Sequence, residues 1–200
     1  MTAEPWLAGL VLAGGRSTRM QRDKATLAFG GETQLARAVR LVGRHASETF
    51  VSVRADQTTE AERARWPQVI DRLTDAGPVA GILAALETRP EHAWLVVAVD
   101  LPLLDAATLE RLVARRDPTV LATAYRSSED GLPEPLCAIW EPRSREPLAA
   151  FVASGRSCPR KFLLAHPARL LELAVPGALA NVNTPADYAA ALARADGSAP

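Results

Sequence analysis

The chain has 200 residues, 48% of them apolar, and its 23 basic side chains are balanced by 23 acidic ones. This length and apolar content are enough for one sizeable core, and the balanced charge argues against a molecule-wide field that would attract nucleic acid or an acidic membrane. Cys137 and Cys158 form no CxxC motif and no Cys/His cluster, so neither a zinc site nor a disulfide framework is indicated. The N-terminus lacks the pattern of a signal peptide, and no apolar run approaches the ~20 residues that cross a bilayer. We therefore expect a soluble cytoplasmic protein that binds neither nucleic acid nor membrane.

Apolar runs of strand length alternate with helical patterns along the chain. We expect strands at 7–13, 49–53, 68–70, 94–99, 120–125, 135–140 and 169–173, and helices at about 33–44, 79–88, 106–115 and 184–195. The strands at 7–13 and 94–99 are apolar almost throughout, as expected of central parallel strands that are covered on both faces. The alternation predicts a single-domain α/β fold with a doubly wound, mostly parallel sheet. A polar connection at 125–135 precedes a less regular half, which predicts a small inserted antiparallel segment.

The segment LAGGRSTRMQRDK (12–24) follows the first predicted strand with two glycines and then four cations. The cations are Arg16, Arg19, Arg22 and Lys24. The glycines allow a sharp turn and expose backbone amides, and cations this close repel one another unless an anion joins them. Exposed amides followed by cations form a pocket for phosphate oxygens, so a nucleoside triphosphate is the expected ligand. Neither the Walker string GxxxxGK[ST] nor the dinucleotide fingerprint GxGxxG is present here.

The pattern L-A-G-G-x-x-x-R-M-x-x-D-K closely resembles the opening motif of the nucleotidyltransferases, and specifically of the molybdenum cofactor guanylyltransferases. VIDR (69–72), GPVAGI (77–82), VAVDLPLL (97–104) and ANVNTPADY (180–188) follow in the family's order, so the resemblance covers nearly the whole chain. It implies a Rossmann-like nucleotidyltransferase domain over 1–195, and the residues 196–200 are expected to form a disordered tail. The activity it implies is Mg²⁺-dependent transfer of GMP from GTP to molybdopterin (molybdenum cofactor), with release of pyrophosphate.

The resemblance also assigns roles to individual residues. Asp100 would hold the catalytic Mg²⁺ and act together with Lys24 and Arg19, which bind the phosphates. The nucleotide would be bound by Leu12, Ala13, Gly14, Gly15, Lys24, Asp71 and Asp100, and the acceptor by Asn181 and Asn183. Among relatives, LAGG accompanies guanine and LAAG accompanies cytosine, so Gly14 favours GTP over CTP. Molybdoenzyme-maturation proteins are candidate partners.

The position of Asp100 supports a metal site independently of the resemblance. A carboxylate at the end of a central parallel strand lies beside the crevice where open α/β sheets bind ligands. Mg²⁺ in such sites is commonly held by one or two carboxylates, phosphate oxygens and waters. An attacking phosphate monoester is largely ionised at pH 7, since its second pKa is about 6, and needs no general base. The remaining requirement is to bring anions together by positioning and screening.

Several features leave alternatives open. Gln21 stands where the family usually has glycine, Arg54 where it often has a nucleotide-contacting asparagine, and LPEPLC (132–137) where it has His-Pro on the pterin side. Asp71 could pair with Arg72 or cap a turn, and the asparagines could form local turn hydrogen bonds. The basic segment 156–162 is expected to be a solvated helix end rather than a phosphate site. Alternative functions are a cytidylyltransferase, a transferase for another phosphorylated acceptor, or a non-catalytic nucleotide- or cofactor-binding protein.

Overall fold

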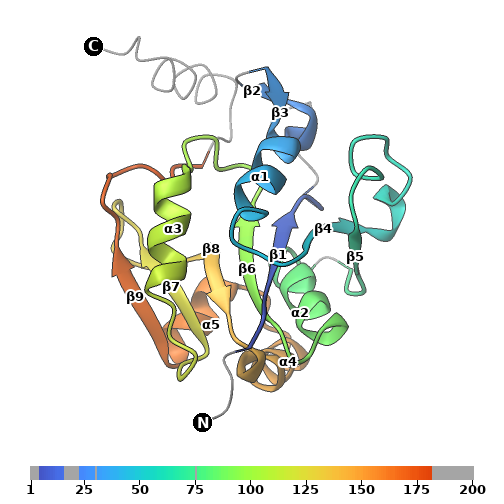
Figure 1. The fold of residues 1–200 in the computed structure, drawn as a ribbon. Coiled ribbons are helices and arrows are strands. Elements are labelled where there is room, and N and C mark those ends of the chain that lie inside the picture. Colours follow the sequence, from blue (N-terminus) through green and yellow to red (C-terminus); the bar gives the residue numbers. More distant parts are fainter. Residues whose placement is uncertain (1–4, 16–22, 30, 75, 182–200) are drawn as a thin grey trace.

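A computed structural model describes residues 5–15, 23–29, 31–74 and 76–181. It contains a seven-stranded sheet with helices on both faces and a short two-stranded hairpin (Figure 1). The strands of the main sheet are β1 (Leu7–Leu12), β4 (Thr49–Arg54), β5 (Gln68–Asp71), β6 (Ala93–Ala98), β7 (Ala122–Arg126), β8 (Pro133–Trp140) and β9 (Ala168–Glu172). The hairpin is formed by β2 (Ala28–Phe29) and β3 (Glu32–Thr33). The helices are α1 (Gln34–Val42), α2 (Pro78–Thr88), α3 (Ala106–Ala114), α4 (Arg145–Ala153) and α5 (Pro159–Ala165), with short 3₁₀ turns η1 (Lys24–Thr26), η2 (Ala55–Gln57) and η3 (Pro142–Ser144).

The main sheet has the strand order β5-β4-β1-β6-β8-β7-β9. Strands β5, β4, β1 and β6 are parallel neighbours, whereas β8 is antiparallel to both β6 and β7. Strand β9 pairs in parallel with β7. This arrangement confirms the predicted mostly parallel sheet and the inserted antiparallel segment. It also places the ends of β1, β4, β5 and β6 at one edge, together with the beginning of β8.

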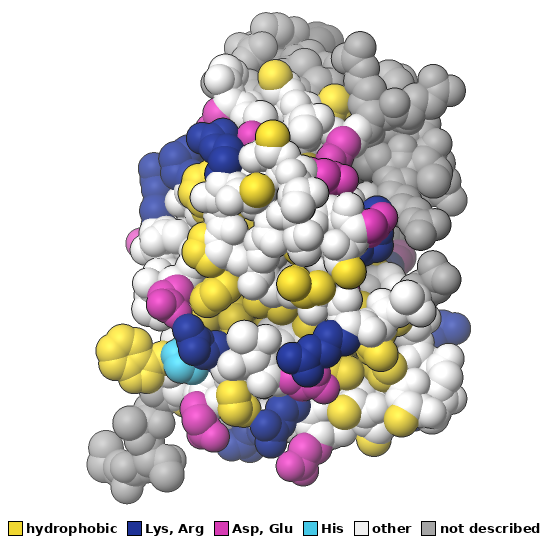
Figure 2. All heavy atoms as spheres, turned by 90° about the vertical axis from the view of Figure 1, so that its right-hand side faces the viewer, with side chains coloured by type: hydrophobic (Ala, Val, Ile, Leu, Met, Phe, Trp, Pro, Cys, Tyr) yellow, Lys and Arg dark blue, Asp and Glu magenta, His cyan; other side chains and the backbone are white. Residues whose placement is uncertain are grey.

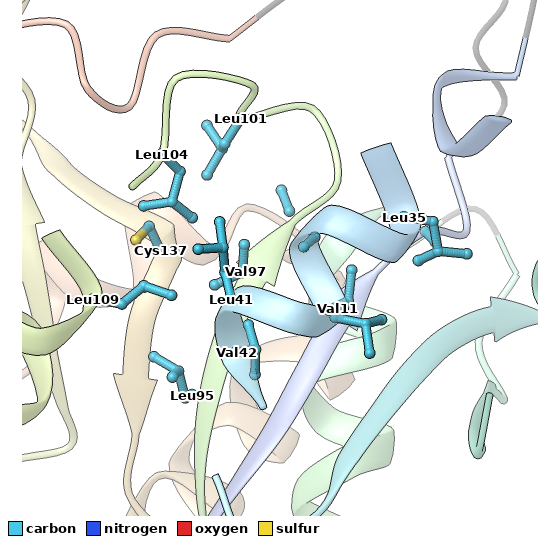
Figure 3. Close-up of a cluster of buried hydrophobic side chains, with 14 of the residues drawn as sticks. Val11, Leu35, Leu41, Val42, Leu95, Val97, Leu101, Leu104, Leu109 and Cys137 are labelled. Carbon is cyan, nitrogen blue, oxygen red and sulfur yellow. The ribbon is translucent and has the colours of Figure 1, made fainter. Parts of the chain in front are cut away.

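Two layers of apolar side chains cover the sheet. Helices α1 and α3 pack on one face and α2, α4 and α5 on the other. Neighbouring residues of one strand belong to opposite layers: Val11 lies in the α1/α3 cluster, which is shown in Figure 3, and Leu10 lies in the other. Trp94 and Leu95 divide in the same way on β6. Because successive strand side chains point to opposite faces, a strand covered on both faces is apolar throughout, which explains the continuous apolar runs.

Helix α2 lies very close to the ends of β1 and β4. A Cβ atom at Gly81 would lie 2.2 Å from Ser52 Oγ and 2.9 Å from Leu12 Cδ2, so a larger residue would push the helix away from the sheet. Gly77 precedes the helix with φ 65°, a conformation that glycine adopts readily, and Pro78 occupies the first turn. The N-terminus of α2 is therefore held at the edge where the parallel strands end.

The predicted strands and the helices at 33–44, 79–88 and 106–115 are confirmed with small shifts of their ends. The hairpin and helices α4 and α5 had not been predicted. The predicted helix at 184–195 and the tail at 196–200 lie outside the described residues. Within the described ranges, every helix is too short or too polar to cross a membrane. On the face shown in Figure 2, hydrophobic side chains lie across the middle, with charged side chains of both signs around them.

Candidate active site

A cavity of about 270 Å³ opens at the edge where the parallel strands end. Each strand of the parallel half supplies one of its walls: Leu12 ends β1, Arg54 ends β4, Asp71 ends β5, and Asp100 follows β6 by two residues. Gly14 and Gly15 lie between these walls, and the first residues of α2 close another side. The cavity thus combines bare backbone with two carboxylates at the crevice where open α/β sheets bind ligands.

Asp71 is the half-buried carboxylate of this cavity. Ser52 Oγ donates a hydrogen bond of 2.7 Å to Asp71 Oδ1. Burial raises the pKa of Asp71 above its ordinary value, although the Ser52 hydrogen bond and the charge of Arg54 act in the opposite direction. A Cβ atom at Gly14 would lie 3.1 Å from Asp71 Oδ2, which is a tight contact. The absence of a side chain at Gly14 therefore leaves room for this carboxylate.

Arg54 was not assigned a role from the sequence, yet its side chain lines the cavity. Its guanidinium donates to the backbone carbonyl of Gly14 and pairs with Asp56, with Nε 3.0 Å from Oδ1 and NH2 3.1 Å from Oδ2. One signal was available in the sequence: a cation stands directly at the end of a strand whose neighbours end in the glycine pair and in Asp71. The arginine stabilises the turn at Gly14 from the side of β4.

A buried arginine holds the glycine-rich loop at both ends. The side chain of Arg63 is only 1% exposed. Its Nε and NH2 donate to the Ala13 carbonyl at 3.0 and 2.7 Å, and NH2 also donates to Asp23 Oδ1 at 2.9 Å. NH1 pairs with Asp23 and Glu60. Asp23 in turn accepts from the Ala25 amide at 3.0 Å, at the start of η1. Arg63 therefore joins the residue before the glycine pair to the residue before Lys24.

The pKa values of this cluster reflect the same contacts. Burial alone would raise the pKa of Asp23, but the hydrogen bonds from Arg63 and from the Ala25 amide, together with the charges of Arg63 and Arg54, outweigh burial and lower it. Burial alone would lower the pKa of Arg63, but Asp23 and Glu60 raise it above its ordinary value. The pair is thus held in its charged form.

The structure places most of the residues chosen from the sequence near one another. Leu12, Gly14, Gly15, Asp71 and Asp100 all line the cavity. Ala13 was expected to bind the nucleotide. Its side chain is buried in the α1/α3 cluster, and its carbonyl accepts hydrogen bonds from Arg63. Lys24 begins η1. Arg16, Arg19, Arg22 and Asn183 lie outside the described residues.

A second cavity of about 400 Å³ adjoins the first, and the two share Gly77, Pro78 and Leu136 as lining residues. Asn181, chosen from the sequence for the acceptor, lines this second cavity. The other walls are largely apolar and come from Leu101, Pro135, Pro159 and Leu179, with Glu134 and Arg160 as the charged residues. Two ligands in the two cavities would meet at the N-terminus of α2.

A metal site built from protein groups alone is not found in the described part of the chain, where no three His, Cys, Asp or Glu residues form a group that could hold an ion. Asp100 offers one carboxylate to the first cavity. A single carboxylate matches Mg²⁺, which keeps several waters and takes its other ligands from substrate phosphates. The donor set therefore fits an ion that arrives with a nucleotide.

Comparison with known proteins gives a consistent result. The model of the MobA-like NTP transferase domain matches residues 9–172. A molybdenum cofactor biosynthesis bifunctional protein of Synechocystis is 32% identical over 91% of this chain, which spans about half (52%) of that protein's length. A molybdenum cofactor guanylyltransferase of Rhizobium johnstonii is 35% identical and covers 90% of this chain and 89% of its own.

Solved structures share the fold. Molybdopterin-guanine dinucleotide biosynthesis protein A of Archaeoglobus fulgidus superposes with a TM-score of 0.76 over 95% of this chain and 99% of its own, at 20% identity. Rv0371c of Mycobacterium tuberculosis, solved in complex with manganese, gives a TM-score of 0.66 over 95% of this chain and 99% of its own, at 22% identity. At these identities the likeness establishes the architecture of the chain.

Proposed function

The chain belongs to the family of MobA-like NTP transferase domains, and we propose that it transfers GMP from GTP to molybdopterin or molybdenum cofactor with release of pyrophosphate. The observation that carries this proposal is the pair of adjoining cavities. One combines the glycine pair with Asp71 and Asp100, as a nucleotide requires, and the other is larger and mostly apolar, as a ring-containing acceptor requires. The names of the relatives supply the two substrates.

In this proposal GTP occupies the first cavity. Leu12 and the backbone of Gly14 and Gly15 lie along the base, and the Asp71 carboxylate accepts hydrogen bonds from the guanine edge or the ribose hydroxyls. Lys24 and Arg19 bind the phosphates. Their positive charges offset the negative charge that gathers when two phosphorylated substrates meet.

The N-terminus of α2 supports the placement of the phosphates. Gly77 and Pro78 line both cavities, so the positive end of this helix lies at their junction. Helix N-termini favour anions because their backbone N–H groups have no partner within the helix. The α-phosphate of GTP and the phosphate of the acceptor would meet there.

The transfer needs few protein groups. An ionised oxygen of the acceptor phosphate forms a bond to the α-phosphorus of GTP, and the bond between that phosphorus and the β-phosphate oxygen breaks, so pyrophosphate leaves with the electron pair. No proton has to be removed, so the proposed transfer needs no general base. Asp100 would hold Mg²⁺, which supplies screening of the phosphate charges when bound. Lys24 and Arg19 position the phosphates for in-line attack.

Pyrophosphate release tests the proposal. We expect release with GTP and molybdopterin together, but not with either alone, and much less with CTP; release driven equally well by CTP would favour the cytidylyltransferase alternative.

Asp100→Asn should abolish release without unfolding the protein, whereas Glu91→Gln, which changes an exposed carboxylate in the turn before β6, should leave release unchanged. Full activity in Asp100→Asn would contradict the metal assignment. Lys24→Ala should weaken binding of GTP far more than binding of guanosine.

A further inference from the structure

Glu134 is the carboxylate of the second cavity. It lies near the start of β8, and its side chain is 17% exposed. Its Oε2 accepts a hydrogen bond of 3.1 Å from NH2 of Arg160, on α5. The other terminal nitrogen of the same guanidinium, NH1, donates a hydrogen bond of 2.8 Å to Asp130 Oδ2. Arg160 therefore bridges a carboxylate inside the cavity and a more exposed one outside it.

The surroundings of Glu134 suit a flat, largely apolar ring with a polar edge. Leu101, Leu136 and Leu179 line the cavity together with three prolines, and Asn181 adds one amide. Arg160 donates one hydrogen bond to Glu134, from NH2 to Oε2. An ionised carboxylate has two acceptor oxygens, so Glu134 can accept from the paired N–H donors of an aminopyrimidinone edge.

We propose that Glu134 recognises the pterin ring of the acceptor by accepting hydrogen bonds from its N3–H and its 2-amino group. This inference rests on the proposed function, because the acceptor there is a pterin. The pterin edge takes the position of Arg160 NH2 on Glu134, and Asn181 lies in the same cavity to bond the remaining polar atoms of the ring. Glu134 stands in the LPEPLC segment, where the sequence departs from the family pattern on the pterin side.

The displaced arginine does not become a buried unpaired charge. Arg160 is 31% exposed and keeps its bond to Asp130 when it leaves Glu134. Breaking a charge pair is strongly destabilising only where one partner remains buried without compensation. The exchange of Arg160 for a pterin edge on Glu134 is therefore feasible without a large change in the fold.

A pair of probe compounds separates this recognition from simple ring burial. 6-Hydroxymethylpterin carries the 2-amino group, and 6-hydroxymethyllumazine carries an oxygen in its place. Both are titrated by fluorescence in saturating GTP, so that the aminopyrimidinone edge of pterin cannot occupy the guanine position beside Asp71. The wild-type protein should bind the pterin about 10- to 100-fold more tightly than the lumazine, as expected for paired hydrogen bonds to a charged group.

Glu134→Gln should abolish or reverse that preference. A glutamine amide can accept from N3–H and donate to the lumazine oxygen, so the variant matches the lumazine edge instead. Glu146→Gln is the matched control: this carboxylate on α4 is 88% exposed and lines neither cavity, and its loss should leave the ratio of the two affinities unchanged. The KM for molybdopterin in the full reaction should rise about 10- to 100-fold in Glu134→Gln, with the KM for GTP unchanged.

Each outcome decides the inference. Equal affinity of the wild-type protein for the two probes, no pterin binding up to its solubility limit, or an unchanged ratio in Glu134→Gln would overturn it. If pyrophosphate release with GTP and molybdopterin is normal but Glu134→Gln keeps the wild-type KM, the inference fails and the proposed function stands. If release is absent but the pterin preference depends on Glu134, the proposed function fails and the assignment of this pterin site stands.

Discussion

Replacing Arg63 with lysine tests whether the buried guanidinium sets the conformation of the glycine-rich loop. Arg63 donates to the carbonyl of Ala13 and to the carboxylate of Asp23, which in the sequence flank Gly14, Gly15 and the three arginines of the loop. Lysine keeps the positive charge but replaces a planar fork of five N–H donors with a single ammonium group. Arg63→Lys can therefore satisfy one of these two partners well, but not both with the geometry of arginine.

The expected loss of stability follows from the partner left behind. A buried carbonyl that loses its donor costs about 1–3 kcal/mol. With a urea m value of about 2 kcal/mol/M, a loss of about 2 kcal/mol lowers the unfolding midpoint by roughly 1 M. Arg63 holds the pKa of Asp23 low against the effect of burial, so this carboxylate stabilises the fold above about pH 4, and its contribution is lost as pH falls through its folded-state pKa. The gap between wild type and Arg63→Lys should therefore narrow in acid.

Urea unfolding and nucleotide titration check this reasoning together. Arg65→Lys makes the same substitution two residues later, at a side chain that is 61% exposed and pairs with Glu62 at 3.1 Å, and it should change neither measurement. Arg63→Lys should lower the midpoint and weaken binding of GTP more than binding of guanosine, because the loop carries the residues proposed to bind the phosphates. Equal midpoints in the two variants would refute the reasoning. A destabilised Arg63→Lys protein with wild-type affinity for both ligands would show that the arginine supports the fold alone.

Two further substitutions test the first cavity. Gly14→Ala places a Cβ atom 3.1 Å from Asp71 Oδ2, so the overpacking should cost about 1–3 kcal/mol of stability and the displaced carboxylate should weaken GTP binding in a calorimetric titration; unchanged affinity would remove Asp71 from the nucleotide site. Burial raises the pKa of Asp71, so its contribution to stability falls as pH rises from the unfolded-state pKa of about 4 through the folded-state pKa. Asp71→Asn should therefore raise the melting temperature more at pH 8 than at pH 3, where the carboxyl is protonated in both states, and it should weaken GTP binding. An equal shift at both pH values would contradict this assignment.

The sequence predicted the strands and their mostly parallel arrangement because burial on both faces leaves a local apolar pattern. β1 and β6 are covered on both faces and are therefore apolar at every position, which is visible without any partner. Helix α5 could not be found in this way. It has seven residues, and the basic segment 156–162 suggested a solvated helix end. Phe162 is nevertheless fully buried, with its ring centroid 5.7 Å from Trp140 and 5.4 Å from Phe151, and these contacts arise only in the folded chain.

The site was predictable where a motif carries its chemistry. Gly14, Asp71 and Asp100 stand at strand ends, and the topology of a parallel sheet brings strand ends together. Arg63 gave no such signal, because in the sequence it stands in a run of mixed charges that resembles a solvated surface. Its main partners are 50 and 40 positions away, at Ala13 and Asp23. Long-range pairing of this kind depends on the tertiary fold rather than on local sequence.

In the proposed function, the arrangement of charge in the two cavities lets a chain of zero net charge bring two anionic substrates together. In the proposed complex, guanine and pterin carry the same aminopyrimidinone edge at their outer ends, and both molecules carry phosphate at their inner ends. Asp71 and Glu134 lie in separate cavities, and the N-terminus of α2 lies between them. In this complex the two carboxylates accept hydrogen bonds from the N–H edges of the rings, and the positive end of the helix lies next to the phosphates. Electrostatic complementarity is therefore local and does not require a basic protein.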